Sequence, residues 1–228
     1  MSKTMIINFK NYRQTSTEED SQRLAFAAER ASRESGVDII VAPPATMLRS
    51  VSSRVRIPVF SQNVELAKEG ASTGRQIPEL VKDAGASGTI LNHSEYRSNY
   101  TTIMRLMRER LGPLRLMSCV CAGSEVEAAR LAKLNPDFLA FEPPGLIGTG
   151  MAVSVNEPQL VLRTLRAVRE AGFRNKFLIG AGISTGYDAA EGSALGTDGL
   201  LVSRAVVEAP DWHAKITELA GALESGKR

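Results

Sequence analysis

A glutamate stands between a short apolar run and a loop rich in proline and glycine. Residues 138–141 (FLAF) predict a buried strand, and Glu142 follows at its end. Two prolines come next and must end the strand, because proline cannot donate a ladder hydrogen bond. The three glycines of segment 145–150 leave that loop free to move or to present N–H groups to an anion. The segment predicts a general base beside a phosphate-sized lid, whereas a solvated glutamate in an ordinary loop is the alternative.

A lysine and an asparagine end the first apolar run, residues 5–9. Side chains alternate along a strand, so Asn8 and Lys10 share one face and are expected to point toward the mouth of a barrel or sheet. An inward lysine is costly unless it meets an anion. A lysine that extends out to solvent from the strand end is an equally good interpretation of this spacing.

One of the two histidines follows the fourth apolar run. His93 lies in the sequence Asn92-His93-Ser94-Glu95, while His213 lies in a polar helix near the carboxyl terminus. A single histidine at a strand end is more often a structural group than a catalytic one. Beside Glu142 and Lys10, however, it completes a set of carboxylate base, imidazole donor and fixed positive charge. That set suits proton transfer next to a carbonyl group.

The last two apolar runs end in turns that suit an anion. The sequence GAGIS occupies residues 180–184, and Ser203-Arg204 follows the run 199–202. Backbone N–H groups in the turns after strands seven and eight commonly bind phosphate in parallel barrels. Tight turns need glycine in any case, so each turn alone is a weak signal. Together with Gly148, the turns predict a phosphorylated small molecule as ligand.

Strands and helices alternate along the whole chain, which predicts an α/β protein. Apolar runs occur at 5–9, 38–41, 59–62, 89–92, 114–121, 138–141, 177–180 and 199–202. Helical patterns occur at 18–35, 78–84, 101–110, 124–134, 158–171, 187–195 and 211–223, with the weakest at 45–53. Ser16 and Glu19 predict a capping box at the first helix. Eight such units predict one (β/α)8 barrel domain over residues 1–228. An open doubly wound sheet would also alternate, but the first strand lacks a dinucleotide-binding glycine motif.

Composition limits the partners and the cellular location that are expected for this barrel. The 28 basic and 25 acidic residues are interspersed and give a net charge of +3, so nucleic acid is not an expected partner. No apolar run approaches the ~18–20 residues of a membrane span, and the amino terminus turns polar too early for a signal peptide. Cys119 and Cys121 are expected on opposite faces of one strand, unable to form a disulfide and too few for a metal cage. These features predict a cytoplasmic protein.

The ordered motifs resemble those of triosephosphate isomerases of the short archaeal type. The matching segments are NFK at 8–10, GASTG at 70–74, NHSE at 92–95, EPPGLIGTG at 142–150, GAGIS at 180–184 and LGTDGLLV at 195–202. They span essentially the whole chain in the family's order. The resemblance implies a (β/α)8 TIM barrel that interconverts D-glyceraldehyde 3-phosphate and dihydroxyacetone phosphate, in glycolysis and gluconeogenesis. It implies no metal and no organic cofactor.

The resemblance also assigns roles to the reactive side chains. Glu142 corresponds to the base that moves a proton between neighbouring carbons of the substrate. His93 corresponds to a neutral electrophile that polarises the carbonyl and moves protons between the oxygens of the enediol(ate). Lys10 would stabilise negative charge, Asn8 would assist substrate binding, and Glu95 would support the lysine. The phosphate would be bound by the lid at 145–151 and by the last two turns, through Ile147, Gly148, Gly182, Ile183, Ser203 and Arg204.

Self-association is a further implication of the resemblance. The segment GASTG at 70–74 resembles a loop that reaches into a neighbouring subunit near Lys10, which implies a homodimer or homotetramer. The apolar residues of 99–110 are a candidate contact, although ordinary packing inside the barrel is at least as good an explanation.

Three positions depart from the family pattern. Gly145 stands where related short sequences often have glutamate, Tyr96 replaces a frequent arginine, and Ser203-Arg204 replaces a pair of small residues.

Two alternative functions remain open. Another phosphate-binding barrel isomerase or lyase would share the turns, but it would not need the three reactive side chains together. A non-catalytic protein on the same fold is the other alternative.

Overall fold

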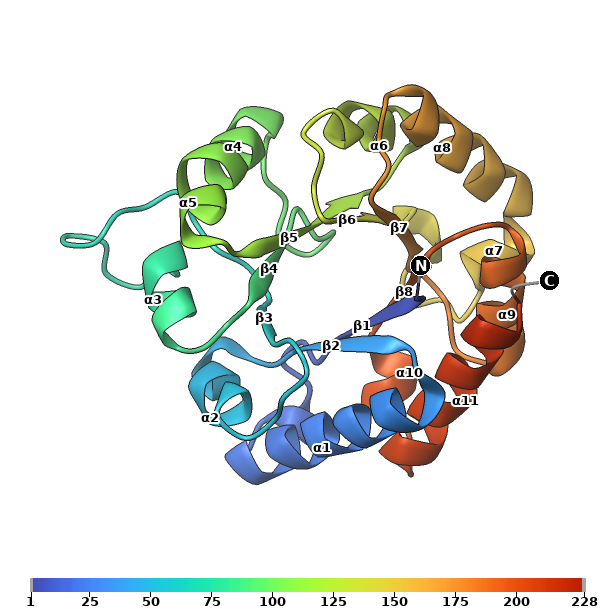
Figure 1. Cartoon of the computed structure of the whole chain (residues 1–228), viewed down its shortest axis with the longest axis horizontal. Helices are drawn as coiled ribbons and strands as arrows, with labels where there is room; N and C mark the ends of the chain where they lie inside the picture. Colours follow the sequence, from blue (N-terminus) through green and yellow to red (C-terminus); the bar gives the residue numbers. More distant parts are fainter. Residues whose placement is uncertain (1, 227–228) are drawn as a thin grey trace.

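Parallel strands close into a ring at the centre of the protein (Figure 1). The computed structural model describes residues 2–226. Within that range the strand order is β2-β1-β8-β7-β6-β5-β4-β3, and a parallel bridge between Val41 and Val59 joins the two ends of the sheet. The strands are β1 (Thr4–Asn8), β2 (Asp38–Ala42), β3 (Phe60–Ser61), β4 (Gly88–Leu91), β5 (Met117–Ala122), β6 (Phe138–Phe141), β7 (Lys176–Ile179) and β8 (Gly199–Val202). The predicted (β/α)8 barrel is confirmed.

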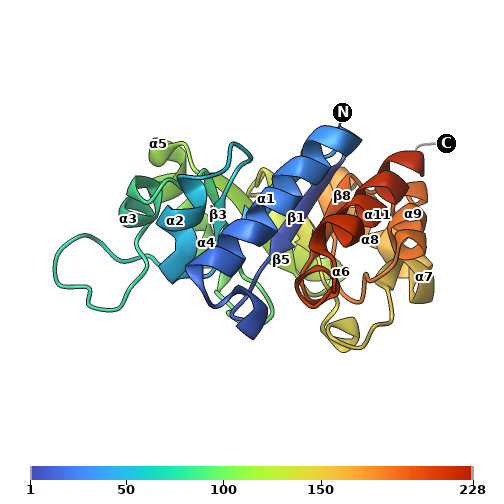
Figure 2. The same cartoon turned by 90° about the horizontal axis from the view of Figure 1, so that it is seen from below.

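Helices surround the ring and connect successive strands (Figures 1 and 2). The longer ones are α1 (Glu18–Ser35), α3 (Pro78–Asp83), α4 (Tyr100–Arg105), α6 (Glu125–Ala132), α8 (Pro158–Glu170), α9 (Gly186–Ala194) and α11 (Trp212–Ser225). Shorter ones are α2 (Leu48–Ser52), α5 (Gly112–Leu114), α7 (Val153–Asn156), α10 (Arg204–Val207) and the 3-10 turns η1 (Arg13–Thr15), η2 (Ala45–Met47) and η4 (Pro144–Leu146). A π-helix, η3 (Leu106–Leu111), continues α4.

Two apolar layers result from the alternation of side chains along the strands. In β1, Ile6 belongs to the core inside the barrel, while Met5 and Ile7 belong to the core between strands and helices. The inner core also holds Phe60 and Phe138, whose rings contact edge to face with centroids 6.0 Å apart. This filled interior closes the amino end of the barrel and leaves the carboxyl ends of the strands to form the site.

Several local predictions need correction. Thr17, not Ser16, caps α1 and accepts the N–H of Asp20, because the Ser16 hydroxyl instead donates to the carbonyl of Arg13. The strand predicted at 114–121 begins only at Met117, since the preceding helix runs through Leu114.

The two cysteines share one face of β5, so their predicted placement on opposite faces is wrong. Residues i and i+2 of a strand point the same way. Cys119 and Cys121 are both buried in the core inside the barrel, and both are free thiols.

The segment 99–110 packs against its own barrel. Ile103 and Leu106, together with Leu111 directly after the segment, are each 1% exposed and belong to the core under the helices. These three side chains therefore cannot form the subunit contact considered for this segment, and ordinary core packing is the correct interpretation for them.

Candidate active site

A cavity of about 350 Å³ opens at the carboxyl ends of the strands. Its size lies at the small end of the range of ligand pockets, ~300–1,000 Å³. It brings together every residue that the sequence predicted for the site: Asn8, Lys10, His93, Glu95, Glu142, Ile147, Gly148, Gly182, Ile183, Ser203 and Arg204. These residues come from five different strand ends and the lid, so only the closed barrel makes them neighbours.

The backbone of Glu142 is fixed on both sides. Its N–H donates to the carbonyl of Ala122 (2.8 Å), and the N–H of Gly180 donates to the carbonyl of Phe141 (3.0 Å). A Cβ atom at position 180 would lie 2.6 Å from Oε1 of Glu142, so a glycine is needed there to make room for the carboxylate. Glu142 is 7% exposed, and its Oε2 has no hydrogen-bond partner within residues 2–226. The carboxylate is therefore buried, well positioned and available to a ligand.

His93 presents one ring nitrogen to the cavity. The N–H of Glu95 donates to Nδ1 at 3.2 Å. Because a nitrogen that accepts this bond carries no proton, the ring is neutral and Nε2 bears the hydrogen. Nε2 lies 3.8 Å from Oε2 of Glu142, which is too far for a direct hydrogen bond. An imidazole donor and a carboxylate acceptor thus flank the same space.

Lys10 lies beside Glu95 at the other side of the pocket. Its Nζ is 2.7 Å from Oε1 of Glu95. Its own backbone is held by two amides, because Asn8 Oδ1 accepts the Lys10 N–H (2.9 Å) and Gln62 Nε2 donates to the Lys10 carbonyl (2.9 Å). The Lys10 side chain is 18% exposed, and the Glu95 side chain that holds it is 59% exposed.

Three of the five non-glycine residues with positive φ in residues 2–226 lie at the mouth of the barrel. Lys10 (φ 49°), Asn92 (φ 59°) and Ala181 (φ 69°) have left-handed conformations and lie close behind β1, β4 and β7. Each such residue costs about 1–3 kcal/mol, and the surrounding structure must compensate for it. Strained residues are common at functional sites, where their unusual backbone conformation orients side chains and backbone groups.

The lid and the turn after β7 are joined through their backbones. The N–H of Val153 donates to the carbonyl of Ala181 (3.2 Å), and a Cβ at Gly182 would lie 2.0 Å from the carbonyl oxygen of Met151. Asp188 also holds this turn, because its Oδ2 accepts hydrogen bonds from the N–H groups of Ser184 and Thr185, each at 2.9 Å.

These two segments contain backbone donors without partners in residues 2–226. The N–H groups of Gly148, Gly182 and Ile183 donate to no acceptor in the described part of the chain. All three residues line the cavity, so their donors are suited to an anionic ligand.

Comparison with known proteins identifies the family. The model of the triosephosphate isomerase family matches residues 3–220. Relatives named triosephosphate isomerase include that of Caldivirga maquilingensis, 43% identical over 96% of both chains. Those of Methanothermus fervidus and Methanocaldococcus jannaschii are 40% and 39% identical, each over 94% of this chain and 96% or 97% of their own. The chain belongs to the triosephosphate isomerase family.

Three residues of this triosephosphate isomerase family member support the site, although the sequence analysis assigned them no such role. The side-chain amide of Asn92 donates to the carbonyl of Cys121 (2.8 Å) and to Glu127 (2.9 Å), and Glu127 also accepts the N–H of Gly123 (2.7 Å). This network ties together the loops after β4 and β5, on which His93 depends. Gln62 supports Lys10 through the hydrogen bond from its side-chain amide to the Lys10 carbonyl. Glu127 looks like an ordinary surface residue of α6 in the sequence, and only the fold reveals its partners.

The thiol of Cys121 lies beside the carboxylate of Glu142. A hydrogen bond with Cys119, burial and the negative charge of Glu142 all raise the pKa of Cys121 well above its usual value. The thiol therefore stays protonated and neutral next to Glu142. The sequence analysis missed this contact because it placed the two cysteines on opposite faces.

Residues 2–226 contain neither a cluster suited to a metal ion nor a helix suited to a membrane. No cluster of three or more histidine, cysteine, aspartate or glutamate side chains there is arranged to hold a metal ion. No helix in the same range is long and apolar enough to cross a bilayer.

Proposed function

We propose that this protein interconverts D-glyceraldehyde 3-phosphate and dihydroxyacetone phosphate through an enediol(ate). The observation that carries the proposal is the arrangement of three groups in one cavity. They are the carboxylate of Glu142, whose Oε2 has no partner within residues 2–226, the neutral ring of His93 with Nε2 3.8 Å from that oxygen, and the ammonium group of Lys10. Family membership supports the same reaction.

Glu142 acts as the base in this proposal. A C–H bond beside a carbonyl is only weakly acidic, so the base must be held close and in line with it. The fixed backbone of Glu142 and its free Oε2 meet that need. The same carboxylate, once protonated, returns the proton to the neighbouring carbon.

His93 and Lys10 stabilise the charge that develops on oxygen. The Nε2–H of His93 donates to the carbonyl oxygen of the substrate. A neutral imidazole can also give up that proton and regain it, and so move a proton between the two oxygens of the enediol(ate). The ammonium of Lys10 lowers the energy of the enediolate by electrostatic attraction. Glu95 holds the lysine in place, and Asn8 fixes the turn that carries it.

The lid and the two last turns bind the phosphate group. Unpaired N–H groups at Gly148, Gly182 and Ile183 donate to its oxygens, and Ile147 and Ser203 complete that end of the cavity. Lid segment 145–151 excludes water, which strengthens the electrostatic interactions and protects the enediolate from losing its phosphate.

Isomerisation in D₂O tests the proposed proton transfer. A carboxylate base exchanges its proton with solvent before returning it, so the product should carry deuterium at the carbon that receives the proton, as seen by NMR. A direct hydride shift between the carbons would leave the product without deuterium and would contradict the role given to Glu142.

We also propose that the protein forms a homodimer, with a homotetramer as the larger alternative, and that it is cytoplasmic. The loop between β3 and α3 projects away from the barrel in both Figure 1 and Figure 2. Residues 68–71 and 73–75 in it are exposed. Arg110 fixes the base of the loop by donating to the carbonyl of Ala67 and to Glu79, whose Oε2 is 2.5 Å away. A protruding loop held firmly at its base is suited to insertion into a second copy.

Sedimentation equilibrium at micromolar concentration tests this assembly. The wild-type chain should have at least twice its 24.6 kDa mass. A variant in which residues 70–74 are replaced by a two-residue turn should sediment as a monomer. A wild-type chain that is monomeric at these concentrations would refute the proposed self-association.

A further inference from the structure

The hinge that precedes the lid rests on a glycine of a neighbouring loop. Pro144 is the first residue of η4, the turn that leads into the lid segment. A Cβ atom at Gly123, in the loop after β5, would lie 3.2 Å from both Cγ and Cδ of the Pro144 ring. The proline ring therefore packs closely against the backbone of this glycine.

The guanidinium group of Arg97 lies against the same glycine. A Cβ atom at Gly123 would be 2.5 Å from its Nη2. Arg97 belongs to the loop after β4, which also carries His93. Three segments thus meet at Gly123, namely the loop of His93, the loop after β5 and the lid hinge at Pro144.

The carboxylate of Glu127 connects the members of this junction. Its Oε2 accepts the N–H of Gly123 (2.7 Å), and its Oε1 accepts the side-chain amide of Asn92 (2.9 Å). Nη1 of Arg97 lies 3.3 Å from each of the two oxygens and also 3.3 Å from the carbonyl oxygen of Asn92. Because hydrogen bonds to an ionised acceptor are the stronger kind, one side chain holds both loops in register.

Position, more than stability, is what this ion pair can control. The side chains of Arg97 and Glu127 are only half-buried, and water screens such a pair, so it contributes little to the stability of the fold. Glu127 nevertheless lies on a fixed element, because Ser124 caps α6 by accepting the Glu127 N–H (3.2 Å). Gly145, the first residue of the lid, has no side chain that could add to the contact at Pro144.

We propose that Glu127 and Arg97 are positioning residues for the lid. The pair holds the junction at Gly123 on which Pro144 rests, and it thereby fixes the lid hinge relative to the loop of His93. This inference rests on the proposed function only for the role of the lid in catalysis. Neither Glu127 nor Arg97 lines the cavity, and neither takes part in the proton transfer.

A spin label on the lid tests this inference without relying on catalysis. Gly145→Cys provides an exposed attachment site for a nitroxide, since a Cβ there would meet no atom within 4 Å, and the two native cysteines are buried. Glu127→Gln keeps the shape of the side chain but loses its charge and replaces an acceptor oxygen with an NH₂ group. The electron paramagnetic resonance spectrum of the label should therefore show sharper lines in the Glu127→Gln background. An unchanged spectrum would overturn the inference.

Glu125→Gln is the matched control. Glu125 lies on the same helix, α6, and forms an ion pair with Arg163 at 3.5 Å, so its substitution also removes one charge and one ion pair. The spectrum of the label at position 145 should stay unchanged in this variant. Equal sharpening in both variants would indicate a general loosening of α6 and would contradict the role given to Glu127.

Loss of phosphate from the enediolate provides a second measurement. In this side reaction the C–O bond to the phosphate breaks, the phosphate leaves with the electron pair, and the remaining enol becomes methylglyoxal. A displaced lid hinge protects the enediolate less well. Glu127→Gln should therefore raise the amount of inorganic phosphate released per isomerisation about tenfold, whereas Glu125→Gln should not, because small displacements at a reacting centre have effects of this size or larger. An unchanged ratio in Glu127→Gln would count against a role in positioning the lid.

Two further outcomes separate this inference from the proposed function. A protein that does not isomerise triose phosphates, but whose lid label responds to Glu127→Gln alone, would refute the proposed function and support the placement of the hinge. If Glu127→Gln does not fold, as judged by circular dichroism, Arg97→Lys provides the same test, since lysine keeps the charge but lacks the second nitrogen that lies against Gly123. A label as immobile in that variant as in the wild-type background would count against the inference.

Discussion

Replacing Glu142 with glutamine is expected to lower kcat by about 10³-fold and to change KM little. General base catalysis contributes ~10²–10⁴-fold, and glutamine has the shape of glutamate but cannot accept the proton from carbon. The hydrogen bonds from Glu142 N–H to Ala122 and from Gly180 N–H to the Phe141 carbonyl do not involve the Glu142 side chain, so the fold should be retained. Steady-state kinetics of the purified variant in both reaction directions would measure the loss.

The same substitution should raise thermal stability slightly. The buried carboxylate of Glu142 has an oxygen without a partner within residues 2–226, and an unpaired buried charge destabilises the folded state. Removing that charge is expected to stabilise the protein by roughly 1 kcal/mol, seen as a higher Tm.

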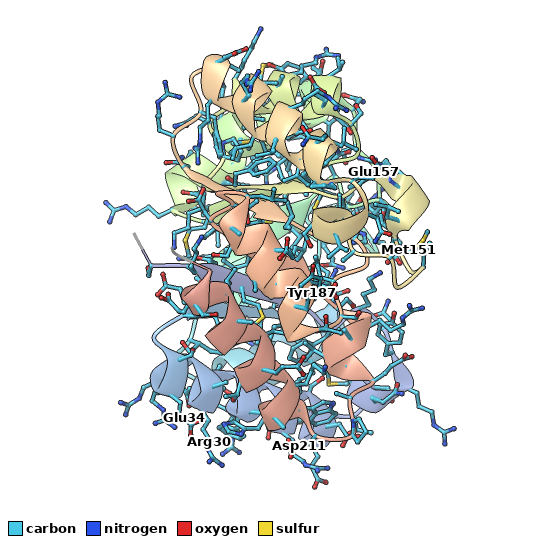
Figure 3. All side chains as sticks on the ribbon, turned by 90° about the vertical axis from the view of Figure 1, so that its right-hand side faces the viewer. Arg30, Glu34, Met151, Glu157, Tyr187 and Asp211 are labelled. Carbon is cyan, nitrogen blue, oxygen red and sulfur yellow. The ribbon has the colours of Figure 1, made fainter. Side chains whose placement is uncertain are left out.

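Glu157→Gln is the control for this experiment. Glu157, labelled in Figure 3, is exposed at the start of α8 and lies outside the residues that line the cavity. Its substitution should leave kcat unchanged. A Glu142→Gln variant that retains a tenth or more of the wild-type kcat would show that another group removes the proton.

Replacing Lys10 with methionine is expected to lower kcat/KM by about 10³-fold. Loss of one group that stabilises an oxyanion typically costs ~10²–10³-fold in kcat, and weaker attraction of the anionic substrate adds to this. The substitution also leaves Glu95 without the partner that lies 2.7 Å away, so the site gains an uncompensated negative charge. Methionine keeps the length and the apolar stem of the lysine side chain, which limits effects on packing.

Lys133→Met serves as the charge-matched control for Lys10. Lys133 is exposed at the end of α6, before β6 and therefore at the amino end of the barrel. Kinetic constants of this variant should match those of the wild type. If Lys10→Met reduced kcat/KM by less than tenfold, the electrostatic role of Lys10 would be untenable.

Much of the site could be predicted from the sequence because its residues follow strand ends. The alternation of side chains placed Asn8 on the inner face of β1, and the two prolines after Glu142 marked the end of β6. Lys10 lies beyond the end of β1 with a left-handed backbone (φ 49°), so alternation does not explain how it reaches the cavity. Once eight parallel strands close into a barrel, every such end opens onto the same cavity. Local rules and topology were sufficient for Asn8 and Glu142.

Features that depend on contacts between distant segments could not be predicted in this way. Three hydroxyl residues in a row, Thr15 to Thr17, precede α1, and only the turn at Arg13 decides that Thr17 is the cap. The support that Asn92 receives from Glu127 joins residues 35 positions apart. The projection of the loop after β3 likewise depends on Arg110, 43 positions beyond Ala67.

Turnover of D-glyceraldehyde 3-phosphate by the purified wild-type protein tests the central proposal most directly. The assay couples formation of dihydroxyacetone phosphate to its reduction by an NADH-dependent dehydrogenase, with no metal added. The arrangement of Glu142, His93 and Lys10 predicts kcat of ~10 s⁻¹ or more, the ordinary range for enzymes. A correctly folded protein with negligible turnover would contradict the proposed function and direct attention to another phosphorylated substrate.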